Sequence, residues 1–171
     1  AFYASVECVE LGLDPFKVNL VVADPTRGGG AITLAATPAI KKLGVSSRGR
    51  IFEIDPKIEY MMAPPRMHLY MEYSCKVYKV FLEFIAKEDI HVYSIDESFL
   101  DVTSYLKLYQ VNAKELAKKI LDRIYEKTGL TATVGIGTNL YLAKIAMDIS
   151  AKHNADRMAY LNEDLYRQTL W

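Results

Sequence analysis

An acidic dipeptide near the middle of the chain lies between two apolar, strand-like segments. Residues 93–101 read Tyr-Ser-Ile-Asp-Glu-Ser-Phe-Leu-Asp, within a stretch, 90–103, that contains no glycine or proline. The β-branched and aromatic residues of this stretch predict two strands joined tightly around 94–97. The carboxylates of Asp96 and Glu97 would then stand at the tip of a hairpin, at one edge of a sheet.

Helices and strands alternate on both sides of this predicted hairpin. Apolar residues at helical spacing predict helices over 2–11, 38–43, 70–86, 112–127 and 139–149. Apolar, β-branched runs predict strands over 18–23, 31–36, 51–54 and 131–136. Thr37 is a candidate N-cap ahead of Pro38, and Asn112 and Glu115 are spaced as a capping box. The pattern predicts an α+β fold, ferredoxin-like in its second half, with a mainly antiparallel sheet and helices on one face.

The composition predicts a folded, reduced protein without a membrane segment. The 171 residues suit one domain or two small lobes, and 51% of them are hydrophobic, which rules out wholesale disorder. No apolar run approaches the ~20 residues that span a bilayer, and no signal peptide is visible. Cys8 and Cys75 form no Cys-x-x-Cys pair, so we expect buried thiols in a cytoplasmic protein. The chain begins without Met, which predicts a fragment or a disordered start.

The charge is balanced, with 21 Lys and Arg residues against 21 Asp and Glu residues. A complete protein that neutralises a phosphate backbone is normally basic, so this balance weighs against a complete nucleic-acid-binding protein. His68, His91 and His153 lack ligand spacing, which argues against a zinc site. The glycines at 28–30 are not followed by the Lys-Ser/Thr of a phosphate-binding loop.

Two groups of charged residues could carry chemistry. Asp96 and Glu97 offer hard oxygen ligands that suit Mg²⁺, or they are two solvated acids of a polar turn. Lys41 lies in a run, 41–50, that holds cations and no acid. Lys144 could reach an anion at the start of its helix, where the dipole favours negative charge. For most such lysines, solvation at the surface is the alternative explanation.

Phe2 and Tyr3 place two aromatic rings side by side at the start of the first predicted helix. Most aromatic pairs belong to the core. The functional alternative is a flat platform for a sugar or a base.

Four segments, taken in chain order, carry a family resemblance. Residues 1–7, Ala-Phe-Tyr-Ala-Ser-Val-Glu, and residues 94–101, Ser-Ile-Asp-Glu-Ser-Phe-Leu-Asp, look like two signature motifs. The pair of segments 133–137 and 142–146 is similar to a third family segment. Residues 34–45 look like a fingers segment, in the form found in UV-damage repair proteins of Gram-positive bacteria and their mobile elements. Over nearly its whole length the chain thus resembles the Y-family, translesion DNA polymerases.

The resemblance implies a polymerase site that uses Mg²⁺. Asp96 would be a metal-binding carboxylate, and Glu97 would be the adjacent catalytic acid and a second metal ligand. Tyr3 would be the steric gate, whose ring lies where a ribose 2′-OH would project. The family's first metal-binding Asp lies just upstream of the motif at 1–7, so we expect this chain to lack one of three metal carboxylates.

The resemblance also implies contacts to the incoming nucleotide. Lys144 would touch the triphosphate, and Lys41 would stand where the family usually has a phosphate-binding Arg or Lys. The backbone amides around Phe2 would face the phosphates. A Tyr that often helps to bind the triphosphate is replaced by Pro38, which weakens the case for that contact.

By the same resemblance, residues 1–67 form a small fingers subdomain with the start of a palm helix, and residues 68–171 form the palm. The thumb and little-finger domains, which hold duplex DNA in the family, are expected to be absent. The implied partners are a DNA primer-template and a dNTP, with a sliding clamp contacted through the absent C-terminal region, and no membrane.

The first hypothesis is therefore a template-directed DNA polymerase acting in translesion synthesis and DNA repair. It would transfer a nucleotidyl group from dNTP to a primer 3′-OH by two metal ions. We expect residues 1–171 alone to be inactive or nearly so, and to bind Mg²⁺ weakly. The missing carboxylate and the balanced charge keep open a catalytically inactive scaffold that binds replication or repair proteins. A nucleotide cyclase with a similar palm would need acidic and glycine-rich turns that this hairpin lacks.

Overall fold

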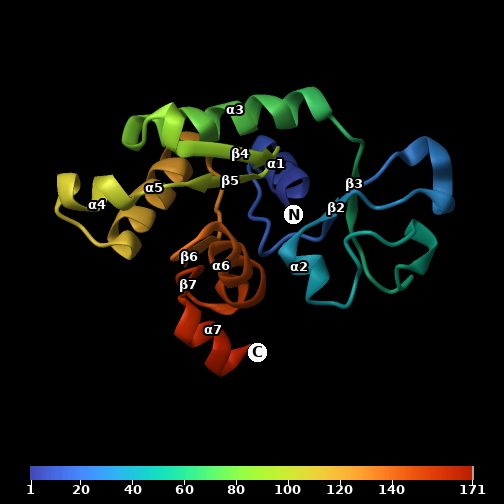
Figure 1. Ribbon diagram of the computed structural model, residues 1–171. Coiled ribbons are helices and arrows are strands. Elements are labelled where there is room, and N and C mark those ends of the chain that lie inside the picture. Colours follow the sequence, from blue (N-terminus) through green and yellow to red (C-terminus); the bar gives the residue numbers. More distant parts are fainter. Residues whose placement is uncertain (171) are drawn as a thin grey trace. The chain divides into compact units, whose positions relative to one another are not determined.

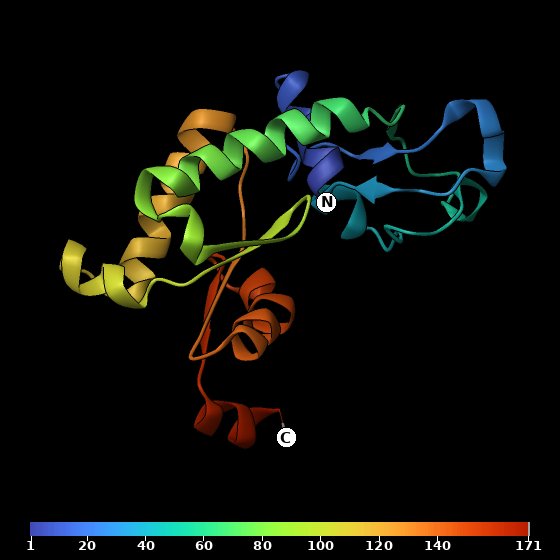
Figure 2. The same cartoon turned by 45° about the horizontal axis from the view of Figure 1, so that its top comes forward.

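The structure, a computed structural model, describes residues 1–170 as two compact units (Figures 1 and 2). The first unit is Ala1–Lys76 and the second begins at Val77. The long helix α3 (Met67–Phe84) contributes to both units. Each unit buries a cluster of its own apolar side chains, and each is described by itself.

A three-stranded sheet organises the first unit. Its strands β1 (Leu20–Val22), β2 (Ala35–Ala36) and β3 (Met61–Ala63) lie in the order β2-β1-β3. Strand β1 pairs antiparallel with β2 and parallel with β3, and all its residues are buried. Two helices belong to this unit as well, α1 (Phe2–Glu10) and α2 (Pro38–Lys41). A central strand that is buried throughout explains the uninterrupted apolar run in its sequence.

Thr37 attaches helix α2 to the central strand. Its Oγ1 donates to the carbonyl of Val18 at 2.7 Å, and it accepts the N–H of Leu20 at 3.1 Å and of Ile40 at 3.5 Å. Thr37 is completely buried, so these bonds satisfy a hydroxyl that the core would otherwise leave unpaired. The predicted N-cap is confirmed, and it positions the helix that carries Lys41.

The strand predicted at 51–54 is wrong, because this segment is a 3₁₀ turn, Ile51–Glu53. It lies beside a second 3₁₀ turn, Pro25–Gly30, in the glycine-rich segment (Figure 2). A single β-bridge between Arg50 and Ile32 precedes the turn, and local hydrogen bonds close it in place of a strand ladder. Apolar residues here pack on the core of the unit without joining its sheet.

The predicted acidic hairpin opens the second unit. Strands β4 (Ile90–Ser94) and β5 (Glu97–Leu100) pair antiparallel, with Ser94 opposite Glu97 at the tip. The register shifts between Val92 and Ser94, which breaks the regular ladder just before the turn. The hairpin prediction is confirmed, and its two-residue turn holds the first of the two acids.

A parallel pair of strands forms the other sheet of this unit. Strands β6 (Val134–Gly137) and β7 (Met158–Leu161) are joined through helix α6 (Leu140–Ile145), which lies alongside them in Figure 1. A π-helix, Ala146–Ser150, continues α6, so the helix predicted through residue 149 changes its hydrogen bonding part-way. Such π segments are short and are common near functional sites.

Three further helices complete the second unit. They are α4 (Thr103–Tyr109), α5 (Ala113–Thr128) and α7 (Glu163–Thr169). The capping box of α5 is confirmed, since Asn112 Oδ1 accepts the Glu115 N–H at 2.8 Å. Sequence periodicity predicts neither α4 nor α7, nor the strands β3 and β7, because each of these elements is too short to show it.

The α+β class is confirmed, and the expected antiparallel pairing holds for β1–β2 and β4–β5. The pairs β1–β3 and β6–β7 are parallel. Parallel strands need long crossover connections, and the order of elements along the chain leaves open which strands those connections bring together. No helix in residues 1–170 is both long and apolar enough to cross a membrane.

The two cysteines lie in different environments. Cys8 is fully buried on α1, and burial raises the pKa of its thiol to about 11, which makes it unreactive. Cys75 is exposed on α3, so the expectation of two buried thiols is correct for Cys8 and wrong for Cys75. The solvent-facing side of α3 accounts for this exposure.

Candidate active site

The acidic pair has two different environments at the hairpin tip. Asp96 lies in the turn and is exposed, and its Oδ1 accepts a hydrogen bond from Ser94 Oγ at 3.0 Å. Glu97 is the first residue of β5, and its side chain is only 26% exposed. One carboxylate is therefore solvated and locally oriented by Ser94, and the other is partly withdrawn from water.

Lys144 pairs with the withdrawn carboxylate. Its Nζ lies 2.7 Å from Glu97 Oε1 and 3.3 Å from Asp148 Oδ2, which is one turn further along the same chain segment. The ammonium also lies 5.5 Å from the centre of the Tyr93 ring. The hydrogen bond to Glu97 is the main reason why the pKa of Lys144 is raised, so the lysine stays charged. The sequence motifs did not identify Asp148 and Tyr93 as neighbours of this ammonium.

Two glycines allow the helix that carries Lys144 to pack directly on a strand. A Cβ on Gly135 would lie 2.0 Å from the carbonyl oxygen of Ala143, and a Cβ on Gly137 would lie 2.3 Å from the Ala143 nitrogen. Neither separation is possible for real atoms, so strand β6 must have glycine at both positions. The close approach fixes the backbone next to Lys144 and gives the Gly-x-Gly segment a structural purpose.

The carboxylates fit a hard cation by their chemistry and supply part of a site. Mg²⁺ prefers oxygen ligands and is commonly held by one or two carboxylates together with substrate phosphates. Asp96 and Glu97 provide two such groups. Across residues 1–170 no cluster of three or more His, Cys, Asp or Glu side chains could hold a metal ion.

The aromatic residues of the first motif are only partly buried on α1. Phe2 and Tyr3 have ring centres 6.0 Å apart. The Tyr3 ring stacks on the ring of Tyr70, from helix α3, with centres 4.5 Å apart and an angle of 13° between the planes. Tyr3 is therefore supported from one side by a buried aromatic ring while part of it stays accessible.

A buried acid lies behind this aromatic stack. Glu7, one turn along α1 from Tyr3, is only 3% exposed and accepts a hydrogen bond from Tyr70 Oη at 2.8 Å. Arg66 binds both carboxylate oxygens, with Nε 3.0 Å from Oε1 and Nη2 on Oε2. Burial raises the pKa of Glu7, but the bonds from Arg66 and Tyr70 outweigh it and hold the pKa below its usual value.

The cations of the short helix and its loop have separate surroundings. Lys41 is the last residue of α2 and is exposed, as is Arg48. Arg50 donates from Nη1 to the Gly30 carbonyl at 2.6 Å, so its charge helps to join the two 3₁₀ turns. Within residues 41–50, Arg50 therefore makes a structural contact, whereas Lys41 and Arg48 are exposed to solvent.

The predicted residues thus fall into two groups, one in each unit. The first unit holds Phe2, Tyr3 and Lys41, and the second holds Asp96, Glu97 and Lys144. Within these units the structure joins Phe2 to Tyr3 and Glu97 to Lys144.

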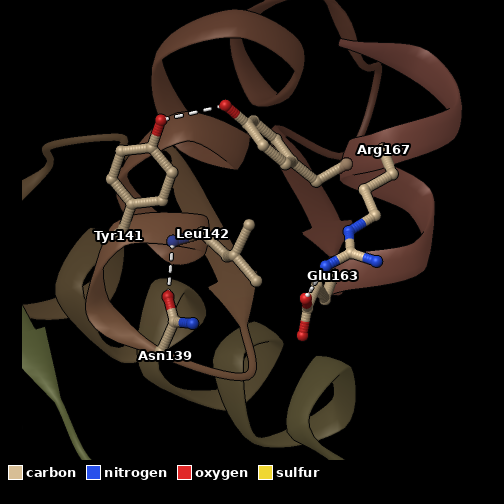
Figure 3. Close-up of a pocket in the computed structure, with 6 residues that line it drawn as sticks. Asn139, Tyr141, Leu142, Glu163 and Arg167 are labelled. Atoms are coloured by element: carbon tan, nitrogen blue, oxygen red, sulfur yellow. Dashed lines mark hydrogen bonds and ion pairs between the residues drawn. The ribbon is translucent and has the colours of Figure 1, made fainter. Parts of the chain in front are cut away.

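A separate cavity lies between the start of α6 and α7. Its volume is about 520 Å³, and Figure 3 shows the side chains that line it. Tyr141 and Tyr166 meet there through their hydroxyls at 3.0 Å, and Glu163 pairs with Arg167 at 2.6 Å. The cavity contains none of the predicted site residues.

A hairpin with two adjacent acids, a lysine on a helix that packs on a glycine-bearing strand and a stacked tyrosine indicate the class of this chain. It belongs to the impB/mucB/samB family, whose model matches residues 1–148. The resemblance to Y-family DNA polymerases that the motifs indicate is confirmed.

Particular relatives agree with this assignment. The chain is 37% identical to UvrX of Bacillus subtilis (strain 168), to which a role in UV-damage repair is attributed, and 37% identical to DNA polymerase IV 2 of the same organism. These alignments cover 100% of this chain and 40% and 41% of the two relatives. The chain therefore spans about two fifths of the length of these curated relatives.

Solved structures match over nearly the whole chain. DinB from Sulfolobus solfataricus superposes with a TM-score of 0.77 at 29% identity, covering 98% of this chain and 47% of that protein. An insertion ternary complex of Dbh DNA polymerase gives a TM-score of 0.77 at 29% identity, covering 98% of this chain and 48% of that one.

Proposed function

We propose that this chain supplies the fingers and palm of a template-directed DNA polymerase that acts in translesion synthesis and DNA repair. The observation that carries the proposal is the acidic pair at the hairpin tip, with Lys144 Nζ 2.7 Å from Glu97, in a chain of this family. The 1–67 and 68–171 boundaries of fingers and palm stay a prediction.

The reaction would join the primer 3′-oxygen to the α-phosphorus of a dNTP and release pyrophosphate. Asp96 and Glu97 would hold Mg²⁺ together with oxygens of the substrate phosphates. When bound, Mg²⁺ would lower the pKa of the 3′-OH and stabilise the pyrophosphate. The Glu97 carboxylate would exchange its bond to Lys144 for metal binding, which would leave the Lys144 ammonium available to the triphosphate.

The other site residues would bind and select the nucleotide. Lys41 and Lys144 would place positive charge beside the triphosphate, and the backbone amides around Phe2 would donate to its oxygens. The Tyr3 ring would occupy the space that a ribose 2′-OH needs. The proposed partners are a DNA primer-template and a dNTP, as the Dbh DNA polymerase complex suggests by its description as an insertion ternary complex. A cytoplasmic location and a sliding-clamp contact outside residues 1–171 belong to the same proposal.

Primer extension across an abasic site, by the natural full-length protein that contains these residues, tests the proposal. We expect Asp96→Ala to reduce extension at least ~100-fold while DNA binding is retained, because the carboxylate acts on the reacting atoms. Glu88→Ala is the matched control, since Glu88 is an exposed acid just before the same hairpin. Unchanged extension by Asp96→Ala would refute the polymerase proposal.

A catalytically inactive scaffold for replication or repair proteins is the second candidate. Its supporting observations are the balanced charge and the lack, among residues 1–170, of a cluster of three or more His, Cys, Asp or Glu side chains that could hold a metal ion. This candidate predicts no extension by the unmodified full-length protein, with DNA-repair partners still bound.

A further inference from the structure

The Tyr3 ring has a support whose own position is fixed from behind. Tyr3 stacks on Tyr70 at 4.5 Å, and Tyr70 is completely buried. The Tyr70 hydroxyl donates to Glu7 Oε1 at 2.8 Å, and Glu7 lies on the same helix as Tyr3. The contacts therefore form a closed path from helix α1 to helix α3 and back.

Stacking alone does little to stop a ring from sliding parallel to its own plane. Offset and tilted arrangements of two aromatic rings have similar energies, so a stacked ring can slide over its partner. The hydrogen bond to Glu7 removes this freedom from Tyr70, because a buried hydroxyl would lose its partner if the ring turned. A fixed Tyr70 in turn gives Tyr3 a fixed surface to lie on.

Arg66 fixes the carboxylate itself. It reaches both oxygens of Glu7, so the carboxylate plane is set by a two-point contact as well as by Tyr70. The Glu7 side chain is 4% exposed, against 48% for Arg66, so the acid is the buried member of the pair. Burying a carboxylate costs folding free energy that an apolar side chain at this position would not. We therefore look for a function of Glu7 that depends on its hydrogen bonds.

We propose that Glu7, held by Arg66 and acting through Tyr70, is a positioning residue that sets how strictly Tyr3 excludes ribonucleotides. The inference rests on the proposed polymerase function and on the Tyr3 steric gate. Exclusion by a steric gate depends on a ring that cannot move away from the 2′-OH. The network supplies that rigidity without touching the nucleotide.

The structure contains a matched control for this network. Tyr73, one turn along α3 from Tyr70, donates its hydroxyl to Glu10 at 2.6 Å, so it links the same two helices by the same kind of bond. No ring contact joins Tyr73 to Tyr3 among the residues described. Removing this second hydroxyl changes the helix–helix contact and leaves the Tyr3 stack intact.

The test compares dNTP with rNTP incorporation by the natural full-length protein on an undamaged template. The readout is the ratio of kcat/KM for dNTP to kcat/KM for rNTP, in which a general loss of folded enzyme cancels. We expect the ratio to fall about tenfold in Glu7→Gln and in Tyr70→Phe, because small misplacements of a positioning group have effects of this order. We expect an unchanged ratio in Tyr73→Phe.

Coupling to Tyr3 completes the test. Tyr3→Ala should give the lowest ratio, and adding Glu7→Gln to it should have no further effect, because the positioned ring is already gone. Tyr70→Phe carries the test if Glu7→Gln does not fold, since it loses a hydroxyl and keeps the ring.

Each outcome has a definite meaning. An unchanged ratio in Tyr70→Phe with a lowered ratio in Tyr3→Ala overturns the inference and leaves the polymerase proposal standing. An equal fall in Tyr73→Phe also overturns it, because any loosening of α1 against α3 would then suffice. Failure of the unmodified protein to incorporate dNTP is recognised before any variant is measured, and it overturns the proposed function and the inference with it.

Discussion

Two carboxylate–cation pairs, one in each unit, have the same chemistry and differ in burial. Glu7 is 3% exposed under Arg66, whereas the side chains of Glu97 and Lys144 are 26% and 30% exposed. Breaking the buried pair would leave a buried charge without its ionic partner, while water can replace either member of the half-exposed pair. The comparison separates a pair that fixes structure from a pair that can exchange partners.

Exchange of partners is what the proposed reaction requires of the second pair. Glu97 would turn to a metal ion and Lys144 to the triphosphate. Asp148, at 3.3 Å from Lys144 Nζ, would keep one carboxylate near the ammonium throughout. In the first pair the acid is the buried member, and it also accepts a hydrogen bond from Tyr70, the tyrosine that supports Tyr3. Burial and bonding therefore match the two proposed roles.

The largest effect is expected where strand β6 contacts helix α6, which carries Lys144 of the half-exposed pair. Gly135→Ala places a Cβ 2.0 Å from the Ala143 carbonyl oxygen, so strand β6 and helix α6 must separate. Overpacking typically costs 1–3 kcal/mol, and a clash with rigid backbone should cost at least about 3 kcal/mol. Thermal unfolding should show a fall in Tm of roughly 6–12 °C.

Gly30→Ala is the control for this substitution. A Cβ on Gly30 meets nothing within 4 Å, so we expect no measurable loss of stability there. A stable Gly135→Ala variant with Lys144 still paired to Glu97 would show that the close packing of α6 on β6 is not what positions the lysine.

The next largest effect is expected from a substitution that removes Arg66 from its buried pair with Glu7. Arg66→Met leaves the Glu7 carboxylate in the core with only the Tyr70 hydroxyl as a partner. Removal of one member of a buried pair costs about 3–5 kcal/mol, and we expect a value near 3 kcal/mol because Arg66 is half exposed. Denaturant unfolding measures the loss. Lys118→Met, in an exposed pair with Asp122, should show no measurable change.

The same variant should reverse the pH dependence that Glu7 contributes. In the unmodified chain the pKa of Glu7 lies below its ordinary 4.5, so its stabilisation is present above that pH and is lost as the pH falls through the lowered value. Without Arg66, burial raises the pKa of Glu7 above its ordinary value, so acidification would remove a cost of the buried carboxylate in place of a stabilisation. The difference in unfolding free energy between the unmodified chain and Arg66→Met, measured from pH 7 to pH 3, should therefore shrink as the pH falls, and a constant difference would contradict this assignment.

Local patterns predicted the hairpin and the caps but not the buried network. The Ile90–Leu100 hairpin and the Asn112–Glu115 box depend on residues close in sequence, where spacing and side-chain type carry the information. Glu7 and Arg66 are 59 residues apart, and an acid in an amphipathic helix normally faces solvent.

The candidate site shows the same division. Motif resemblance led to Asp96, Glu97 and Lys144 through their neighbours in sequence. The contact of Lys144 with Glu97 spans 47 residues and depends on how β6 and α6 pack. Gly135 and Gly137 were visible as a motif, but their purpose appears only when the backbone distances are known. Spacing thus predicts which residues matter, and the fold determines which of them pair.

The smallest effect on stability is expected from Glu97→Gln, which tests the half-exposed pair of Glu97 and Lys144. The substitution removes the charge of the half-exposed pair while Lys144 keeps Asp148 and solvent, so the loss should stay below about 1 kcal/mol. Primer extension by the full-length protein should nevertheless fall, because Glu97 is a proposed metal ligand. A loss as large as that of Arg66→Met would show that the second pair is structural too, and the distinction between the two pairs would fail. Small destabilisation together with lost extension would establish that one carboxylate–cation pair maintains the fold while the other is available for chemistry.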